Sequence, residues 1–214
     1  SDIQRKIVLV SGAPGAGKTT LAVPLAQLLG FPIFSKDFIK ETLTDVFGDG
    51  GGDLASSRRI GGASMELIWS LASHAPQAVL EANFRPHSDY ERAKLVGLGA
   101  LIVEVHCDCG RAETAKRFRD RAATSGHHAA HPLKEIPPEM LDEYDRPMGL
   151  GPVVEVDTRT PVDLDRVLAE VQRLLDVCIG IKSPDTGLSQ SHPDQAVSAN
   201  PAASVGPPDA ALIF

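Results

Sequence analysis

The chain has 214 residues, of which 43% are hydrophobic and 23% charged, as is usual for one domain that folds around a hydrophobic core. Its 28 acidic and 21 basic side chains give a net charge of −7, which makes nucleic acid an unlikely main partner. Three cysteines are too few for a disulfide framework. The sequence contains no run of 18 apolar residues, which is about the length needed to span a membrane. We expect a cytoplasmic protein with no membrane association, as a monomer or a homodimer.

The end of the chain has the composition of a linker. Residues 183–214 contain five Pro, five Ser and six Ala, and they lack Lys and Arg. We therefore expect one domain over residues 1–180 and a flexible tail over residues 181–214.

Short apolar runs alternate with amphipathic segments along the expected domain, a pattern typical of a parallel sheet flanked by helices. The expected strands are Lys6–Ser11, Pro32–Ser35, Ala78–Glu81, Leu101–Cys107 and Val153–Asp157. The expected helices are Lys18–Leu29, Asp37–Phe47, Ser57–His74, Ser88–Leu98, Arg111–Ala123 and Asp163–Val177. Most of these strands lack polar alternation, so we expect helices on both faces of the sheet.

Two segments interrupt this pattern. Gly48–Gly52 is predicted to be a flexible loop between two helices. Thr124–Pro138 contains three His and three Pro, and with the end of the preceding helix it is predicted to form a lid over residues 117–138. His127, His128 and His131 are interpreted as polar lid residues or substrate contacts.

The first expected strand runs into a G-x-x-x-x-G-K-T sequence, the pattern of a Walker A loop. Small residues let successive backbone N–H groups surround a polyphosphate at the start of the next helix. The lysine can bridge the β and γ phosphates, and the threonine hydroxyl can bind Mg²⁺. The residues expected to hold ATP and Mg²⁺ are Gly12, Ala13, Pro14, Gly15, Ala16, Gly17, Lys18, Thr19 and Thr20.

Acidic residues follow two of the other strands. The carboxyl ends of parallel strands share one edge of the sheet, so Asp37 should face the phosphate loop. There it could accept the proton of an attacking hydroxyl or simply cap its helix, and Lys40 lies one turn later. Glu81 ends the third strand and is predicted to hold Mg²⁺ through water.

Further residues are candidates for binding the substrate or the phosphates. Asn83 and Arg85 follow the third strand, and Trp69 is interpreted as pocket wall or core, together with Phe38, Phe47 and Met65. Arg117 and Arg121 lie four residues apart on one helical face just before the lid, where they could close over the triphosphate.

The order of these motifs resembles the zeta-toxin and polynucleotide-kinase-like P-loop kinases, a group that includes chloramphenicol phosphotransferase. The likeness spans residues 6–178 and rests on GAPGAGKTT at 12–20, SKDFIK at 35–40, EANFRP at 81–86, and Arg117 with Arg121. It implies a P-loop α/β sandwich whose five parallel strands take the order 2-3-1-4-5. It also implies that Asp37 is the general base and that Arg121 is a catalytic lid charge. The family's usual aspartate after the third strand is replaced here by Glu81.

We therefore predict a kinase that transfers the γ-phosphate of ATP to a hydroxyl of a small molecule such as a nucleoside, a sugar or an antibiotic. The N-K-x-D segment of GTPases is missing from the sequence, although GTP stays open as a donor. Two alternatives also stay open: a polynucleotide 5′-hydroxyl kinase and a nucleotide-binding regulatory ATPase.

Overall fold

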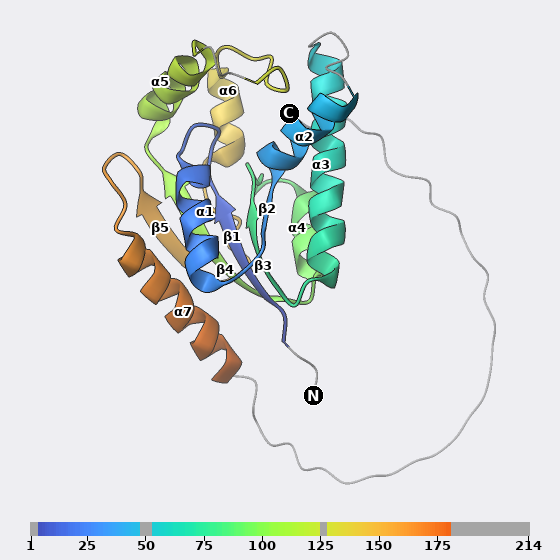
Figure 1. The fold of residues 1–214 in the computed structure, drawn as a ribbon. Helices are drawn as coiled ribbons and strands as arrows, with labels where there is room; N and C mark the ends of the chain where they lie inside the picture. The colour runs from blue at the N-terminus through green and yellow to red at the C-terminus, as the bar shows by residue number, and fades with distance from the viewer. Residues whose placement is uncertain (1–3, 48–52, 125–127, 181–214) are drawn as a thin grey trace, which may run out of the picture.

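The computed structural model describes residues 4–47, 53–124 and 128–180. The predicted Gly48–Gly52 loop, His127 and the tail lie outside the described residues. Seven α-helices and one short 3-10 helix accompany five strands in the described part (Figure 1). Their bounds, in chain order, are β1 Lys6–Ser11, α1 Lys18–Leu29, β2 Ile33–Ser35, α2 Lys36–Phe47, α3 Leu54–His74, β3 Gln77–Glu81, α4 Asp89–Gly97, β4 Leu101–Asp108, α5 Arg111–Ala122, α6 Pro138–Leu141, η1 Asp142–Tyr144, β5 Val153–Asp157 and α7 Leu164–Gly180.

The five strands form one parallel sheet in the order β2-β3-β1-β4-β5, which confirms the predicted fold class and strand order. Helices α1 and α7 cover one face of the sheet, and α3 and α4 cover the other (Figure 1). All five strands therefore end at the same edge, where the loop before α1 begins. This edge is where the candidate site residues converge.

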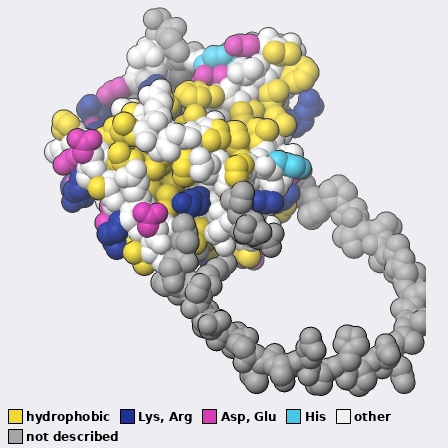
Figure 2. Space-filling model, turned by 60° about the horizontal axis from the view of Figure 1, so that its bottom comes forward, with side chains coloured by type: hydrophobic (Ala, Val, Ile, Leu, Met, Phe, Trp, Pro, Cys, Tyr) yellow, Lys and Arg dark blue, Asp and Glu magenta, His cyan; other side chains and the backbone are white. Residues whose placement is uncertain are grey.

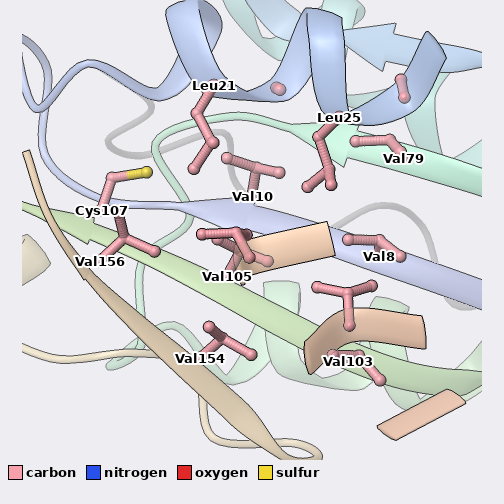
Figure 3. Close-up of a cluster of buried hydrophobic side chains, with 14 of the residues drawn as sticks. Val8, Val10, Leu21, Leu25, Val79, Val103, Val105, Cys107, Val154 and Val156 are labelled. Carbon is pink, nitrogen blue, oxygen red and sulfur yellow. The ribbon is translucent and has the colours of Figure 1, made fainter. Parts of the chain in front are cut away.

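Strand β1 shows why its sequence lacks polar alternation. Successive side chains of a strand point to opposite faces. Val8 and Val10 pack under α1 in the cluster drawn in Figure 3, whereas Ile7 and Leu9 pack against the α3 side. All four side chains are fully buried, so each face of β1 requires an apolar residue.

The observed elements differ from the predicted ones mainly at their ends. Helix α3 begins at Leu54, three residues before the predicted start, because the carboxylate of Asp53 accepts a hydrogen bond of 2.9 Å from the Ser56 backbone N–H. The short helices α6 and η1 were not predicted. They pack with α5 through the apolar cluster of Phe118, Ile136, Met140, Leu141 and Tyr144.

The described parts of the predicted lid region are α5, residues 128–137 and α6; they lie above the carboxyl edge of the sheet and are called the lid below (Figure 1). At the opposite end of the molecule, basic and acidic side chains are interspersed among hydrophobic ones (Figure 2). Across residues 4–47, 53–124 and 128–180, no helix has both the length and the apolar character that a membrane span needs.

Candidate active site

The loop between β1 and α1 needs glycine at positions where the backbone turns or comes close to another strand. Gly12 has φ +137°, and a Cβ there would lie 2.3 Å from the carbonyl oxygen of Cys107 at the end of β4. Gly17 takes the left-handed conformation, φ +82°, at the residue before α1. The loop therefore lies close to the end of β4, and helix α1 begins directly after it.

Lys18 is 6% exposed, and its ammonium group donates a hydrogen bond of 2.8 Å to the carbonyl oxygen of Ala13 across the loop. Burial lowers the pKa of Lys18, while the carboxylates of Glu81 and Asp37 oppose this shift. The lysine therefore lies over the loop, bound to the Ala13 carbonyl oxygen, and its positive charge is favoured by two nearby acidic side chains.

Thr158, which sequence reasoning missed, supports the loop from the segment after β5. Its hydroxyl donates a hydrogen bond of 2.7 Å to the Ala16 carbonyl oxygen. Its own carbonyl oxygen accepts a hydrogen bond of 2.9 Å from the Arg117 guanidinium. One residue thus connects the phosphate loop with a lid arginine, and the only sequence signal for it is its position just after a strand.

A cavity of about 230 Å³ opens beside the loop. It brings together residues from the phosphate loop, α2, α3, the end of β3, α5 and the lid. The predicted site residues that line it are Pro14, Gly15, Gly17, Lys18, Thr19, Thr20, Asp37, Lys40, Asn83, Arg117 and Arg121.

Asp37 reaches this cavity because α2 begins directly where β2 ends. Burial favours the neutral acid, but the positive charges around the carboxyl group outweigh burial and hold the pKa of Asp37 below its usual range. In order of effect these charges are His131 in its protonated form, Lys18, Lys36 and Arg121; because burial lowers the pKa of His131, the lysines and Arg121 carry the effect at neutral pH. Asp37 is therefore a carboxylate at neutral pH and can accept a proton.

Thr19 and Glu81 form the predicted metal position. The Thr19 hydroxyl donates to one carboxylate oxygen of Glu81 at 3.3 Å, and the Ser35 hydroxyl donates to the other at 2.5 Å. Burial raises the pKa of Glu81, an effect that Lys18 opposes. Hydroxyl and carboxylate oxygens are the donors that Mg²⁺ prefers, so these side chains fit the ion.

The two lid arginines are held differently. The Arg117 guanidinium donates to Glu113 at 2.8 Å as well as to Thr158. Arg121 is exposed, and its guanidinium lies 5.8 Å from the centre of the Phe118 ring. Arg117 is thus fixed in place, whereas Arg121 lines the cavity from a solvent-exposed position.

The structure does not bring Trp69 or Arg85 to this cavity: of the two interpretations of Trp69 the core is confirmed and the pocket wall is wrong, and Arg85 is not placed as expected. Trp69 is 4% exposed and packs in the core against Phe84, with ring centroids 5.9 Å apart, because its face of α3 turns toward the sheet. The Arg85 guanidinium instead donates to Glu91 at 2.8 Å.

The apolar wall predicted from Phe38, Phe47 and Met65 is also wrong. Phe38 and Phe47 are 47% and 76% exposed, and Met65 belongs to the core. The apolar lining comes instead from α3, the lid and η1, through Leu54, Phe118, Pro132, Leu133, Met140 and Tyr144.

Several polar lining residues were missed or left undecided. Lys36, Ser57 and Arg58 line the cavity, as does His131, one of the three lid histidines. Lys36 could have been found from its place beside Asp37 at a strand end. Ser57 and Arg58 gave no such signal, because only the packing of α3 against α2 turns them inward.

Comparisons with known proteins show the same fold in other chains. The chain is similar to the structure of a candidate kinase from Chloroflexus aurantiacus J-10-fl, with 26% identity and a TM-score of 0.71 over 80% of this chain and 99% of the other. It shares its fold with a gluconokinase from Sinorhizobium meliloti 1021, at 18% identity and a TM-score of 0.51 over 86% of this chain and all of the other. It also shares its fold with a shikimate kinase from Acinetobacter baumannii in complex with shikimate, at 19% identity and a TM-score of 0.51 over 84% of this chain and 95% of the other.

No curated protein sequence matches the chain. A family model described as an AAA domain, AAA_33, matches residues 7–147. That match covers more than half of the sequence, and the chain belongs to this family.

Proposed function

We propose that the protein is a kinase that transfers the γ-phosphate of ATP, with Mg²⁺, to a hydroxyl group of a small molecule. The observation that carries this proposal is that the ionised carboxylate of Asp37 lines the same cavity as Lys18 and Arg121. A mechanical ATPase has no need of a carboxylate facing an acceptor-sized space beside the phosphate loop. The candidate kinase at 26% identity supports the same assignment.

The phosphate donor would be held by the loop. The backbone N–H groups of Gly12–Thr19 and the amino end of α1 favour a polyphosphate, and Lys18 supplies a positive charge beside its terminal phosphates. Thr19 would hold Mg²⁺ directly and Glu81 through water, and the ion would neutralise charge on the phosphate oxygens. Arg121 would face the transferring phosphoryl group from the lid.

The acceptor would use Asp37. As the acceptor oxygen bonds to the γ-phosphorus, its O–H proton passes to the Asp37 carboxylate. The bond from phosphorus to the bridging oxygen breaks, and ADP leaves with that electron pair. The low pKa of Asp37 keeps it deprotonated before each transfer.

A closer relation to the zeta-toxin and chloramphenicol phosphotransferase group is part of the same proposal. It is supported by Asp37 and Lys40, three residues apart on α2 and both lining the cavity, and by the lid arginines. Glu81 in place of the usual aspartate keeps a carboxylate beside Thr19, at 3.3 Å.

The test is a mass-spectrometric screen of hydroxyl compounds with Mg–ATP, reading an added phosphate and acceptor-dependent release of ADP. Nucleosides, sugars, hydroxy acids, antibiotics and a 5′-hydroxyl oligonucleotide form the panel. We expect phosphorylation of at least one small molecule. Phosphorylation of the oligonucleotide alone would identify a polynucleotide kinase, and ADP release without any phosphorylated acceptor would identify an ATPase.

A further inference from the structure

The residues that line the cavity outside the phosphate loop are strongly basic. Besides Lys18 and the two lid arginines, three more cationic side chains line it: Lys36, Lys40 and Arg58. Among the described residues that line the cavity, Asp37 is the only acidic one. The charge of this region is thus opposite to the net charge of the whole chain, which is −7.

This basic region, formed by Lys36, Lys40 and Arg58, is built where α2 and α3 lie side by side (Figure 1). Lys36 and Lys40 are four residues apart and so share one face of α2. Gly61 of α3 packs against both stems, and a Cβ there would lie 3.8 Å from Cε of Lys40 and 3.9 Å from Cε of Lys36. The Ser57 hydroxyl accepts a hydrogen bond of 2.8 Å from the Lys40 ammonium.

The two lysines are only 6% and 8% exposed, although a buried charge is costly without compensation. Two acids outside the cavity lining act on these lysines electrostatically, Glu91 on Lys36 and Glu41 on Lys40. Each also has another partner, since Glu91 accepts from Arg85 at 2.8 Å and Glu41 pairs with His131 at 3.1 Å. Burial lowers the pKa of Lys36 and lowers that of Lys40 to about 8. A bound anion would offset the cost of burying these ammonium groups.

We propose that the acceptor carries an anionic group, a carboxylate or a phosphate ester, which binds between α2 and α3 at Lys36, Lys40 and Arg58 while its hydroxyl faces Asp37. This inference rests on the proposed kinase function. The anion and the reacting hydroxyl would belong to one small molecule, because Asp37 lines the same cavity as Lys36, Lys40 and Arg58.

The experiment uses pairs of hydroxyl compounds that differ in the anion: gluconate with glucose, glycerate with glycerol, and glucose 6-phosphate with glucose. Each is tested with Mg–ATP for phosphorylation, and with ADP and Mg²⁺ for binding by calorimetry. We expect the anionic member of at least one pair to bind and react about tenfold better or more than its neutral partner. Comparison of the carboxylates with the phosphate ester identifies which anion the region takes.

Variants test whether the preference for the anionic acceptor comes from Lys40. Lys40→Gln should raise KM for the anionic acceptor about tenfold and raise KM for the neutral partner by clearly less, so that the preference for the anion is lost. Lys40→Arg, which keeps the charge, should restore most of the loss. Lys94→Gln removes a lysine that pairs with Glu66 on the surface, and it serves as the matched control. Thermal unfolding of each variant checks that it is folded.

The outcomes separate the two proposals. Equal or better use of the neutral members overturns the anionic acceptor and leaves the kinase standing. Binding of an anionic member that Lys40→Gln abolishes, with no phosphorylation of any compound, keeps the anion site and overturns the kinase. If no compound binds or reacts, both proposals fail.

Discussion

The two ends of the cavity are built in different ways. The phosphate end comes from one continuous segment, Gly12–Thr19, whose shape is determined by glycines at defined backbone angles. The other end is assembled from α2, α3 and the lid, which are distant in sequence. The phosphate end needs a particular backbone, which suits the phosphates of the donor whatever the acceptor is. The assembled end depends on side chains that can vary with the acceptor.

The largest expected effect comes from breaking the continuous end. Gly12→Ala would place a methyl group 2.3 Å from the Cys107 carbonyl oxygen at φ +137°, and we expect a loss of about 2 to 4 kcal/mol in unfolding free energy with loss of ATP binding. Gly30→Ala is the control, because that glycine has φ +67° but no atom within 4 Å of the added Cβ. It should cost only about 1 kcal/mol. For both variants, urea unfolding measures the free energy of unfolding and calorimetry measures ATP binding. An equal loss of unfolding free energy in the two variants would show that the contact with β4 is unimportant.

The free energy of unfolding should depend on pH through Lys40, a residue of the assembled end. Lys40 has a pKa of about 8 in the folded protein against 10.5 when unfolded. Between these values the unfolded chain binds the extra proton, so stability should rise with pH. At pH 7 both states are protonated and the buried charge is a cost, so Lys40→Met should stabilise the apoprotein by about 1 to 3 kcal/mol.

Urea unfolding at pH 7, 8, 9 and 10 measures this effect. The difference between wild type and Lys40→Met should shrink as the pH rises above 8. Lys94→Met, at a partly exposed lysine paired with Glu66, should show no such narrowing. If the difference in unfolding free energy between wild type and Lys40→Met stays constant with pH, the Lys40 ammonium group of the wild type is already compensated in the absence of substrate.

The smallest effect concerns how the lid is attached to α2. His128 pairs with Asp45 and His131 with Glu41, each at 3.1 Å, but the Asp45 side chain is 72% exposed and that of Glu41 37%. Asp45→Asn should therefore cost less than about 0.5 kcal/mol, and Glu41→Gln about 1 kcal/mol. Denaturant unfolding compares the two, and the reverse order would show that His128 is the stronger attachment.

The same contrast explains what the sequence could predict. The Walker A pattern and the strand ends sufficed for the phosphate loop and the position of Asp37, because each is specified by residues close together in the chain, whereas the strand order was implied by the resemblance to P-loop kinases. Trp69 was left between pocket wall and core because one helix face packs on the core and another lines the cavity, and composition alone did not separate them. Arg58 and Tyr144 enter the cavity only through tertiary packing, so no local pattern marks them.

The central claim is that Asp37 accepts the proton of the attacking hydroxyl beside a phosphate held by the loop. The most direct measurement is the single-turnover rate of phosphate transfer by Asp37→Asn, with the best acceptor from the screen and with ATP affinity measured in parallel. We expect the rate to fall about 100- to 10,000-fold while ATP affinity changes little, and the exposed Asp89→Asn to behave as wild type. Transfer by Asp37→Asn at the wild-type rate would contradict the account.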